Sequence, residues 1–229
     1  MNFTQLYLQY QPIITLIYLF LVSALSLVIY LKVKKLYDLS SHRGIQLFGL
    51  AFLYFSIAFF VQLIFSAVKY SGYDNLLSVN IAGILLFTYF ISLPGFYIVY
   101  SLVWKHIEER CSKKMAKARI FILHLIAIII ALISLVLPKI SAHLMFIPQL
   151  AVLSYGILIS YQNYQASNKK NFLQMYFIAM VLWFTGYLVN YLHKFISPYY
   201  IMFAFYVQII TLCIFIIFFY GVAKATSHD

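Results

Sequence analysis

Residues 45–68 read IQLFGLAFLYFSIAFFVQLIFSAV, a stretch with no Asp, Glu, Lys or Arg. An α-helix rises about 1.5 Å per residue, so roughly 20 apolar residues cross the ~30 Å hydrocarbon core of a bilayer. Residues 201–221 read IMFAFYVQIITLCIFIIFFYG and are equally free of charge. Both stretches are therefore predicted to be transmembrane helices.

Further apolar runs of similar length fill the rest of the chain. The seven runs together are approximately 13–31, 45–68, 79–104, 120–137, 144–161, 172–192 and 201–221. Pro138 separates the fourth run from the fifth and favours a hairpin over one long helix, because proline interrupts helical hydrogen bonding. The sequence predicts an all-α polytopic membrane protein, with residues 1–229 forming a single seven-transmembrane-helix domain.

Composition excludes a water-soluble protein. Hydrophobic residues make up 65% of the chain and charged residues only 9%, whereas soluble domains are about half apolar and a quarter charged. The formal net charge of +11 lies in short segments beside apolar runs, which indicates membrane topology and no nucleic-acid partner. The first Lys, Lys32, follows the first run, so this run is interpreted as a retained span and not a cleaved signal peptide.

Basic residues are unevenly distributed between alternate connections. Only Lys69, Lys139 and Lys194 fall in one set, and the other set holds the remaining thirteen of the sixteen Lys and Arg. Cytoplasmic loops of membrane proteins carry the excess of Lys and Arg. We therefore expect a multi-pass protein of the cell membrane with its N-terminus outside and its C-terminus in the cytoplasm.

The second and sixth runs show a weak internal similarity. A constant offset aligns Ala51 with Ala179, Phe55 with Trp183, Ala58 with Gly186, Val61 with Val189 and Gln62 with Asn190. If this reflects duplication, spans one to three and five to seven are parallel repeats joined by the fourth, an arrangement found in transporters. Chance similarity between apolar helices is the alternative.

Uncharged polar side chains gather in the outer halves of the predicted spans. The candidate ligand-binding residues are Gln62, Thr88, Ser92, Gln149, Asn190 and Gln208. Amides within a bilayer need hydrogen-bond partners, so they either line a cavity or bond directly between helices. A cavity here would suit an uncharged or amphipathic small molecule, with Tyr155, Tyr187 and Tyr206 expected nearby.

Pro94 and Gly95 fall near the middle of the third predicted span. Proline removes a helical hydrogen bond and glycine relaxes the backbone, so this pair predicts a kink or a hinge. In transporters an interrupted helix at this depth often marks the binding site. A static kink is the alternative interpretation.

The predicted spans contain no Asp, Glu, Lys or Arg. Proton relays, ion-coupled transport and voltage sensing usually require such a group; only His124 could titrate there, and it is interpreted as an interfacial or helix-packing residue. His143, His193 and Asp74 are scattered over the predicted outer rim and lack the spacing of a helical metal site. We expect no cofactor, no metal and no enzymatic activity.

The connection from Lys105 to Arg119 is predicted to be a basic cytoplasmic loop. Its residues Lys113, Lys114, Lys117 and Arg119 could hold anionic lipid headgroups or a cytoplasmic partner. They could equally serve only to orient the chain.

Pro148 and Gln149 in the fifth run are similar to the proline–glutamine pair of a family of seven-span sugar transporters. In that family each repeat carries the pair in its first helix, whereas here Gln11 precedes Pro12 at the start of the first span. No family is assigned and no binding residue is carried over. Two interpretations of function stay open: binding or transport of a small molecule, and a membrane scaffold or subunit that binds protein or lipid partners. The sequence leaves the oligomeric state open.

Overall fold

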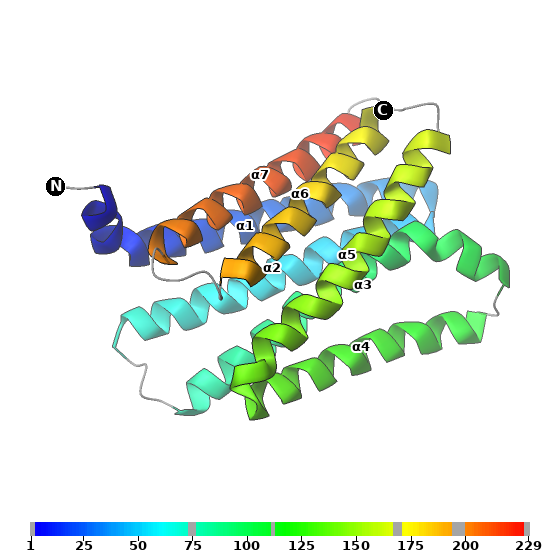
Figure 1. Ribbon diagram of the computed structural model, residues 1–229. Helices are drawn as coiled ribbons and strands as arrows, with labels where there is room; N and C mark the ends of the chain where they lie inside the picture. Colours follow the sequence, from blue (N-terminus) through cyan, green and yellow to red (C-terminus); the bar gives the residue numbers. More distant parts are fainter. Residues whose placement is uncertain (1–2, 73–76, 111–112, 167–170, 194–199, 227–229) are drawn as a thin grey trace.

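The computed structural model describes residues 3–72, 77–110, 113–166, 171–193 and 200–226, and these are helical apart from short turns (Figure 1). The helices are α1 (Phe3–Ser40), α2 (Arg43–Tyr70), α3 (Leu77–Arg110), α4 (Lys113–Val136), α5 (Pro138–Ala166), α6 (Asn171–His193) and α7 (Tyr200–Thr226). The prediction of an all-α bundle is confirmed.

Five of these helices are long and apolar enough to cross a membrane, so the protein is membrane-embedded. The spanning segments are Tyr7–Ser40, Arg43–Tyr70, Ser78–Trp104, Ala118–Val136 and Phe203–Lys224. The described part of α6 contains the shorter apolar segment Tyr176–Val189. Membrane crossing by α5 and α6 stays a prediction.

Helix boundaries agree with the sequence at one end of α4 and differ at the other. α4 ends at Val136 and α5 begins at Pro138, which confirms the hairpin and suits proline at a first helical position. The predicted basic loop from Lys105 to Arg119 is wrong, because α3 continues to Arg110 and α4 begins at Lys113. Lys, Glu, Met, Ala and Arg favour helix even without an apolar face.

The basic residues therefore lie in the first turns of α4. Arg119 is half-buried there, whereas the side chains of Lys113, Lys114 and Lys117 lie outside the described residues. Lipid or partner binding by this segment stays a prediction.

Six helices form a closed ring, and α4 lies outside it. Contacts run from α1 to α2, from α2 to α3, from α3 to α5, from α5 to α6, from α6 to α7 and from α7 back to α1 (Figure 1). Among the described residues, the backbone of α4 comes close only to α3 and α5, although the His124 ring of α4 also contacts Tyr54 of α2. The last helix of the first half, α3, contacts the first helix of the second half, α5. In the same way, the last helix of the second half, α7, contacts the first helix of the first half, α1. This is the contact pattern expected from two parallel repeats, although the duplication itself stays a prediction.

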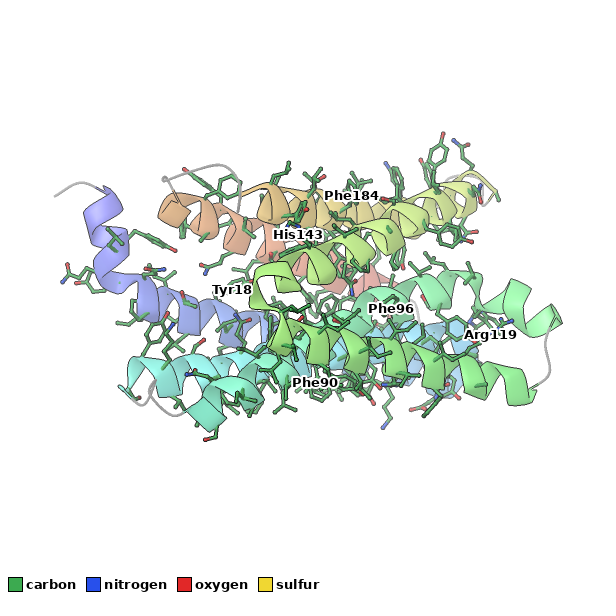
Figure 2. All side chains as sticks on the ribbon, turned by 60° about the horizontal axis from the view of Figure 1, so that its bottom comes forward. Tyr18, Phe90, Phe96, Arg119, His143 and Phe184 are labelled. Atoms are coloured by element: carbon green, nitrogen blue, oxygen red, sulfur yellow. The ribbon has the colours of Figure 1, made fainter. Side chains whose placement is uncertain are left out.

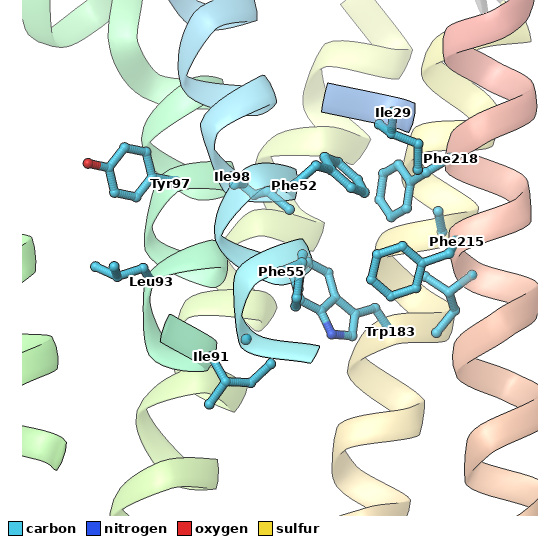
Figure 3. Close-up of a cluster of buried hydrophobic side chains, with 14 of the residues drawn as sticks. Ile29, Phe52, Phe55, Ile91, Leu93, Tyr97, Ile98, Trp183, Phe215 and Phe218 are labelled. Carbon is cyan, nitrogen blue, oxygen red and sulfur yellow. The ribbon is translucent and has the colours of Figure 1, made fainter. Parts of the chain in front are cut away.

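An aromatic cluster joins the two halves of the ring at its centre (Figure 3). Phe55 of α2 lies 5.0 Å from Trp183 of α6 and 5.3 Å from Phe215 of α7, measured between ring centroids. Phe52 lies 5.2 Å from Phe218 in the same way. Tilted and edge-to-face pairs at these distances stabilise a core beyond simple burial.

The outward faces of the helices carry apolar side chains (Figure 2). On α4, Phe121 is 68% exposed, Leu132 51% and Val136 73%, whereas Ala127 and Ala131 are buried against the bundle. Small residues allow α4 to approach α3 and α5 closely, and the large apolar residues suit contact with lipid.

Candidate binding cavity

A cavity of about 520 Å³ lies inside the six-helix ring. Its wall is formed by Tyr18 of α1, Phe52, Phe55, Phe59 and Gln62 of α2, Phe87, Ile91 and Ser92 of α3, Phe146 and Gln149 of α5, Trp183, Gly186 and Tyr187 of α6, and Ala204, Val207, Gln208, Thr211, Ile214, Phe215 and Phe218 of α7. None of the described α4 side chains contributes to this wall. The volume falls within the range of small-molecule sites, roughly 300–1,000 Å³.

The cavity lies mainly in one half of the bundle and extends past the middle of α2 and α7. Gln62 lies toward the C-terminal end of α2, and Phe87 and Ala204 lie toward the N-terminal ends of α3 and α7. Helices that follow one another in the chain run antiparallel, so these positions lie at the end of the bundle where α2 is joined to α3 and α6 to α7 (Figure 1). Phe52 and Phe218 lie farther from that end of the bundle than Gln62 and Gln208. The aromatic cluster therefore forms the inner part of the cavity, and the amides lie nearer the end.

Four of the six predicted binding residues line this single cavity: Gln62, Ser92, Gln149 and Gln208. Thr88 is buried one turn from Ser92 and accepts a hydrogen bond from it, but Thr88 is not part of the wall. The side chain of Asn190 lies outside the described residues. Ligand binding by these residues stays a prediction.

Gln149 is bonded directly to the α3 backbone beside Pro94. Its side chain is 3% exposed, and its Nε2 donates a 2.7 Å hydrogen bond to the carbonyl oxygen of Ser92. The Gln149 carboxamide oxygen also occupies the space that a Cβ atom on Gly95 would need. Direct bonding between helices, one of the two alternatives for the amides, therefore applies to Gln149 although the residue also faces the cavity.

The predicted kink residues lie inside a continuous helix. Pro94 and Gly95 are both buried, and α3 runs unbroken from Leu77 to Arg110. Glycine is needed at position 95 because α5 brings the Gln149 amide against the α3 backbone. Movement at this site stays a prediction.

His124 of α4 bridges two tyrosines on either side of Pro94. Its Nδ1 lies 2.8 Å from the Tyr89 hydroxyl and its Nε2 lies 2.9 Å from the Tyr97 hydroxyl. A neutral imidazole has one donor and one acceptor nitrogen, so both are used. The interpretation of His124 as a helix-packing residue fits this geometry. The sequence gives no signal for its partners, because the rotation of α4 against α3 decides which tyrosines it meets.

No three His, Cys, Asp or Glu side chains cluster among the described residues, and of the rim residues considered for a metal only the side chain of His143 is described. His143 Nδ1 lies 2.9 Å from the Tyr191 hydroxyl. Asp74 and the side chain of His193 lie outside the described residues.

Two of the three tyrosines expected near the cavity point away from it. Tyr155 is 53% exposed and Tyr206 is 54% exposed, and only Tyr187 lines the wall. Residue spacing along one helix could not reveal this, because the rotation of each helix depends on its neighbours. The wall residues that the sequence did not single out are chiefly Tyr18, Phe55 and Phe215.

Comparisons with known proteins give similarity without a function. The chain is 26% identical over 168 residues to an uncharacterized protein of Archaeoglobus fulgidus, covering 68% of this chain and 69% of that relative. No protein-family model matches the sequence. No solved structure matches it either.

Replacing Gly95 with Ala should destabilise the bundle. The new methyl group collides with the Gln149 amide, and such overpacking typically lowers the free energy of unfolding by roughly 1–3 kcal/mol. Gly186→Ala is the matched control, because its added Cβ would lie 3.5 Å from the nearest atom, in Ile210. Denaturation in detergent measures both, and equal stability of the two variants would contradict this account of Gly95.

His124→Phe should lower the free energy of unfolding by roughly 1–2 kcal/mol, because two hydrogen bonds are lost. Tyr97→Phe removes one of the same bonds, so the two substitutions together should destabilise by less than their sum. A double-mutant cycle measures this coupling. Strict additivity would show that the His124–Tyr97 bond contributes nothing to stability.

Proposed function

We propose that the protein binds an uncharged or amphipathic small molecule in the cavity and acts as its carrier or receptor in the membrane. The observation that carries the proposal is the convergence of Gln62, Ser92, Gln149 and Gln208, from four helices, on one cavity. Ligand sites are mostly apolar and contain a few converging polar groups. The aromatic cluster supplies the apolar surface and these residues supply the polar groups.

An uncharged ligand is favoured by the character of the wall. None of its described residues is Asp, Glu, Lys, Arg or His. Moving an ion from water into such a site is unfavourable without an opposite charge. No nucleophile with an adjacent base lines the cavity among these residues, so the proposal is for binding or transport without a chemical step.

We also propose that the N-terminus lies outside the cell and the C-terminus in the cytoplasm. Thirteen of the sixteen Lys and Arg support this orientation. The cavity then lies in the outer half of the bundle, and the basic first turns of α4, from Lys113 to Arg119, lie at the inner surface. There they are close enough to anionic lipid headgroups to bind them.

The orientation predicts that a fluorescent protein that matures only in the cytoplasm will be fluorescent when fused after Asp229. The same reporter fused before Met1 should stay dark. Fluorescence from the N-terminal fusion alone would reverse the orientation and place the cavity in the inner half.

The binding proposal predicts a saturable thermal shift when the detergent-purified protein is screened against neutral metabolites, sugars and lipids. A ligand at 100 times its Kd stabilises the folded state by about 2.7 kcal/mol, which raises Tm by several degrees. Ala204→Phe should abolish the shift because Ala204 lines the cavity. Ala151→Phe is the matched control, since Ala151 is exposed on α5 and outside the wall.

A shift that survives Ala204→Phe would place the ligand elsewhere. The absence of any saturable shift would contradict the proposal and favour a membrane scaffold. For a confirmed ligand, uptake into proteoliposomes separates the two forms of the proposal, because a carrier accumulates the ligand inside and a receptor does not.

A further inference from the structure

The serine and threonine hydroxyl groups of the cavity wall already donate their protons to backbone carbonyl oxygens. Ser92 Oγ donates to the Thr88 carbonyl oxygen at 2.7 Å, and Thr211 Oγ1 donates to the Val207 carbonyl oxygen at 2.8 Å. A hydroxyl has one proton and two lone pairs. Toward the cavity, both groups can therefore only accept hydrogen bonds.

One amide of the wall provides an acceptor without a partner. Gln149 Nε2 donates to the Ser92 carbonyl oxygen. Gln208 Oε1 is buried and has no hydrogen-bond partner among the described residues. Buried carboxamide oxygens in folded proteins almost always accept a hydrogen bond, so Gln208 is suited to a donor that a ligand brings. Among the described wall residues, hydrogen-bond donors remain on the amides of Gln62 and Gln208, on the hydroxyls of Tyr18 and Tyr187 and on the indole N–H of Trp183.

The part of the wall formed by the aromatic cluster presents the faces and edges of aromatic rings. Phe55, Trp183 and Phe215 meet at ring-centroid distances of 5.0 and 5.3 Å, and all three line the cavity. Aromatic side chains prefer offset or edge-to-face contact with another ring. A flat apolar ring therefore fits this surface better than a flexible chain.

We propose that the ligand is a neutral ring compound that carries an N–H or O–H donor. Its ring contacts Phe55, Trp183 and Phe215, and its donor is bonded by Gln208, with Ser92 and Thr211 as further acceptors. This inference rests on the proposed function and deepens it. Aromatic faces also attract organic cations, but no described residue of the wall carries the negative charge that would balance one.

The test uses three probes that share one ring. Indole has a single N–H donor, 1-methylindole lacks that donor, and tryptamine adds an ammonium group. Calorimetric titration of the detergent-purified protein should give a Kd for indole about tenfold lower than for 1-methylindole, because the methylated probe leaves a buried acceptor unpaired.

Gln208→Met should remove this tenfold preference by weakening indole binding alone. Gln46→Met is the matched control, since Gln46 is exposed on α2 and outside the cavity wall. Thr211→Val, which replaces an acceptor with a methyl group of similar shape, provides a second test if Gln208→Met fails to fold. It should reduce the preference without removing it.

Several outcomes would overturn the inference. Equal binding of indole and 1-methylindole contradicts the requirement for a donor, and tighter binding of tryptamine contradicts the requirement for neutrality. If no ring probe binds but a library compound gives a shift that Ala204→Phe abolishes, the ring-donor class is wrong and the proposed function stands. If neither probes nor library bind, both are wrong.

Discussion

The requirement that polar groups inside a bilayer be bonded within the protein governs the structure around α3. Lipid offers no hydrogen-bond partners, so each hydroxyl and amide must find one on its own helix or a neighbour. Ser92 bonds back to α3, Gln149 reaches across from α5, and His124 joins from α4. These bonds fix α3 on both sides of Pro94.

Much of the architecture follows from one-dimensional features of the sequence. Uncharged runs such as 45–68 are long enough to cross a bilayer, and Pro138 separates α4 from α5 as predicted. The failure at Lys105–Arg119 has a simple cause. The length of an apolar run predicts how far a helix is buried in lipid. The helix itself can extend beyond the lipid wherever the following residues favour the helical conformation.

The site could be predicted only in part, because it depends on how the helices are rotated against one another. Gln62, Gln149 and Gln208 stand out in the sequence because amides within apolar runs are rare, and all three face the cavity. Depth along the helix alone predicts Tyr155 and Tyr206 near the cavity, whereas both side chains face outward. The bonds of His124 to Tyr89 and Tyr97 require the register of α4 on α3, which no pattern within either helix encodes.

The position of α4 outside the ring determines the symmetry available to the protein. Three helices carry the chain from one face of the bundle to the other, and α4 returns it before α5 begins (Figure 1). The α1–α3 and α5–α7 halves consequently point the same way, so any axis relating them runs along the bundle and not across it. In proteins with inverted halves, exchanging the conformations of the two halves turns an outward-facing state into an inward-facing one. Parallel halves lack that exchange, so the two faces of this bundle are inherently unlike.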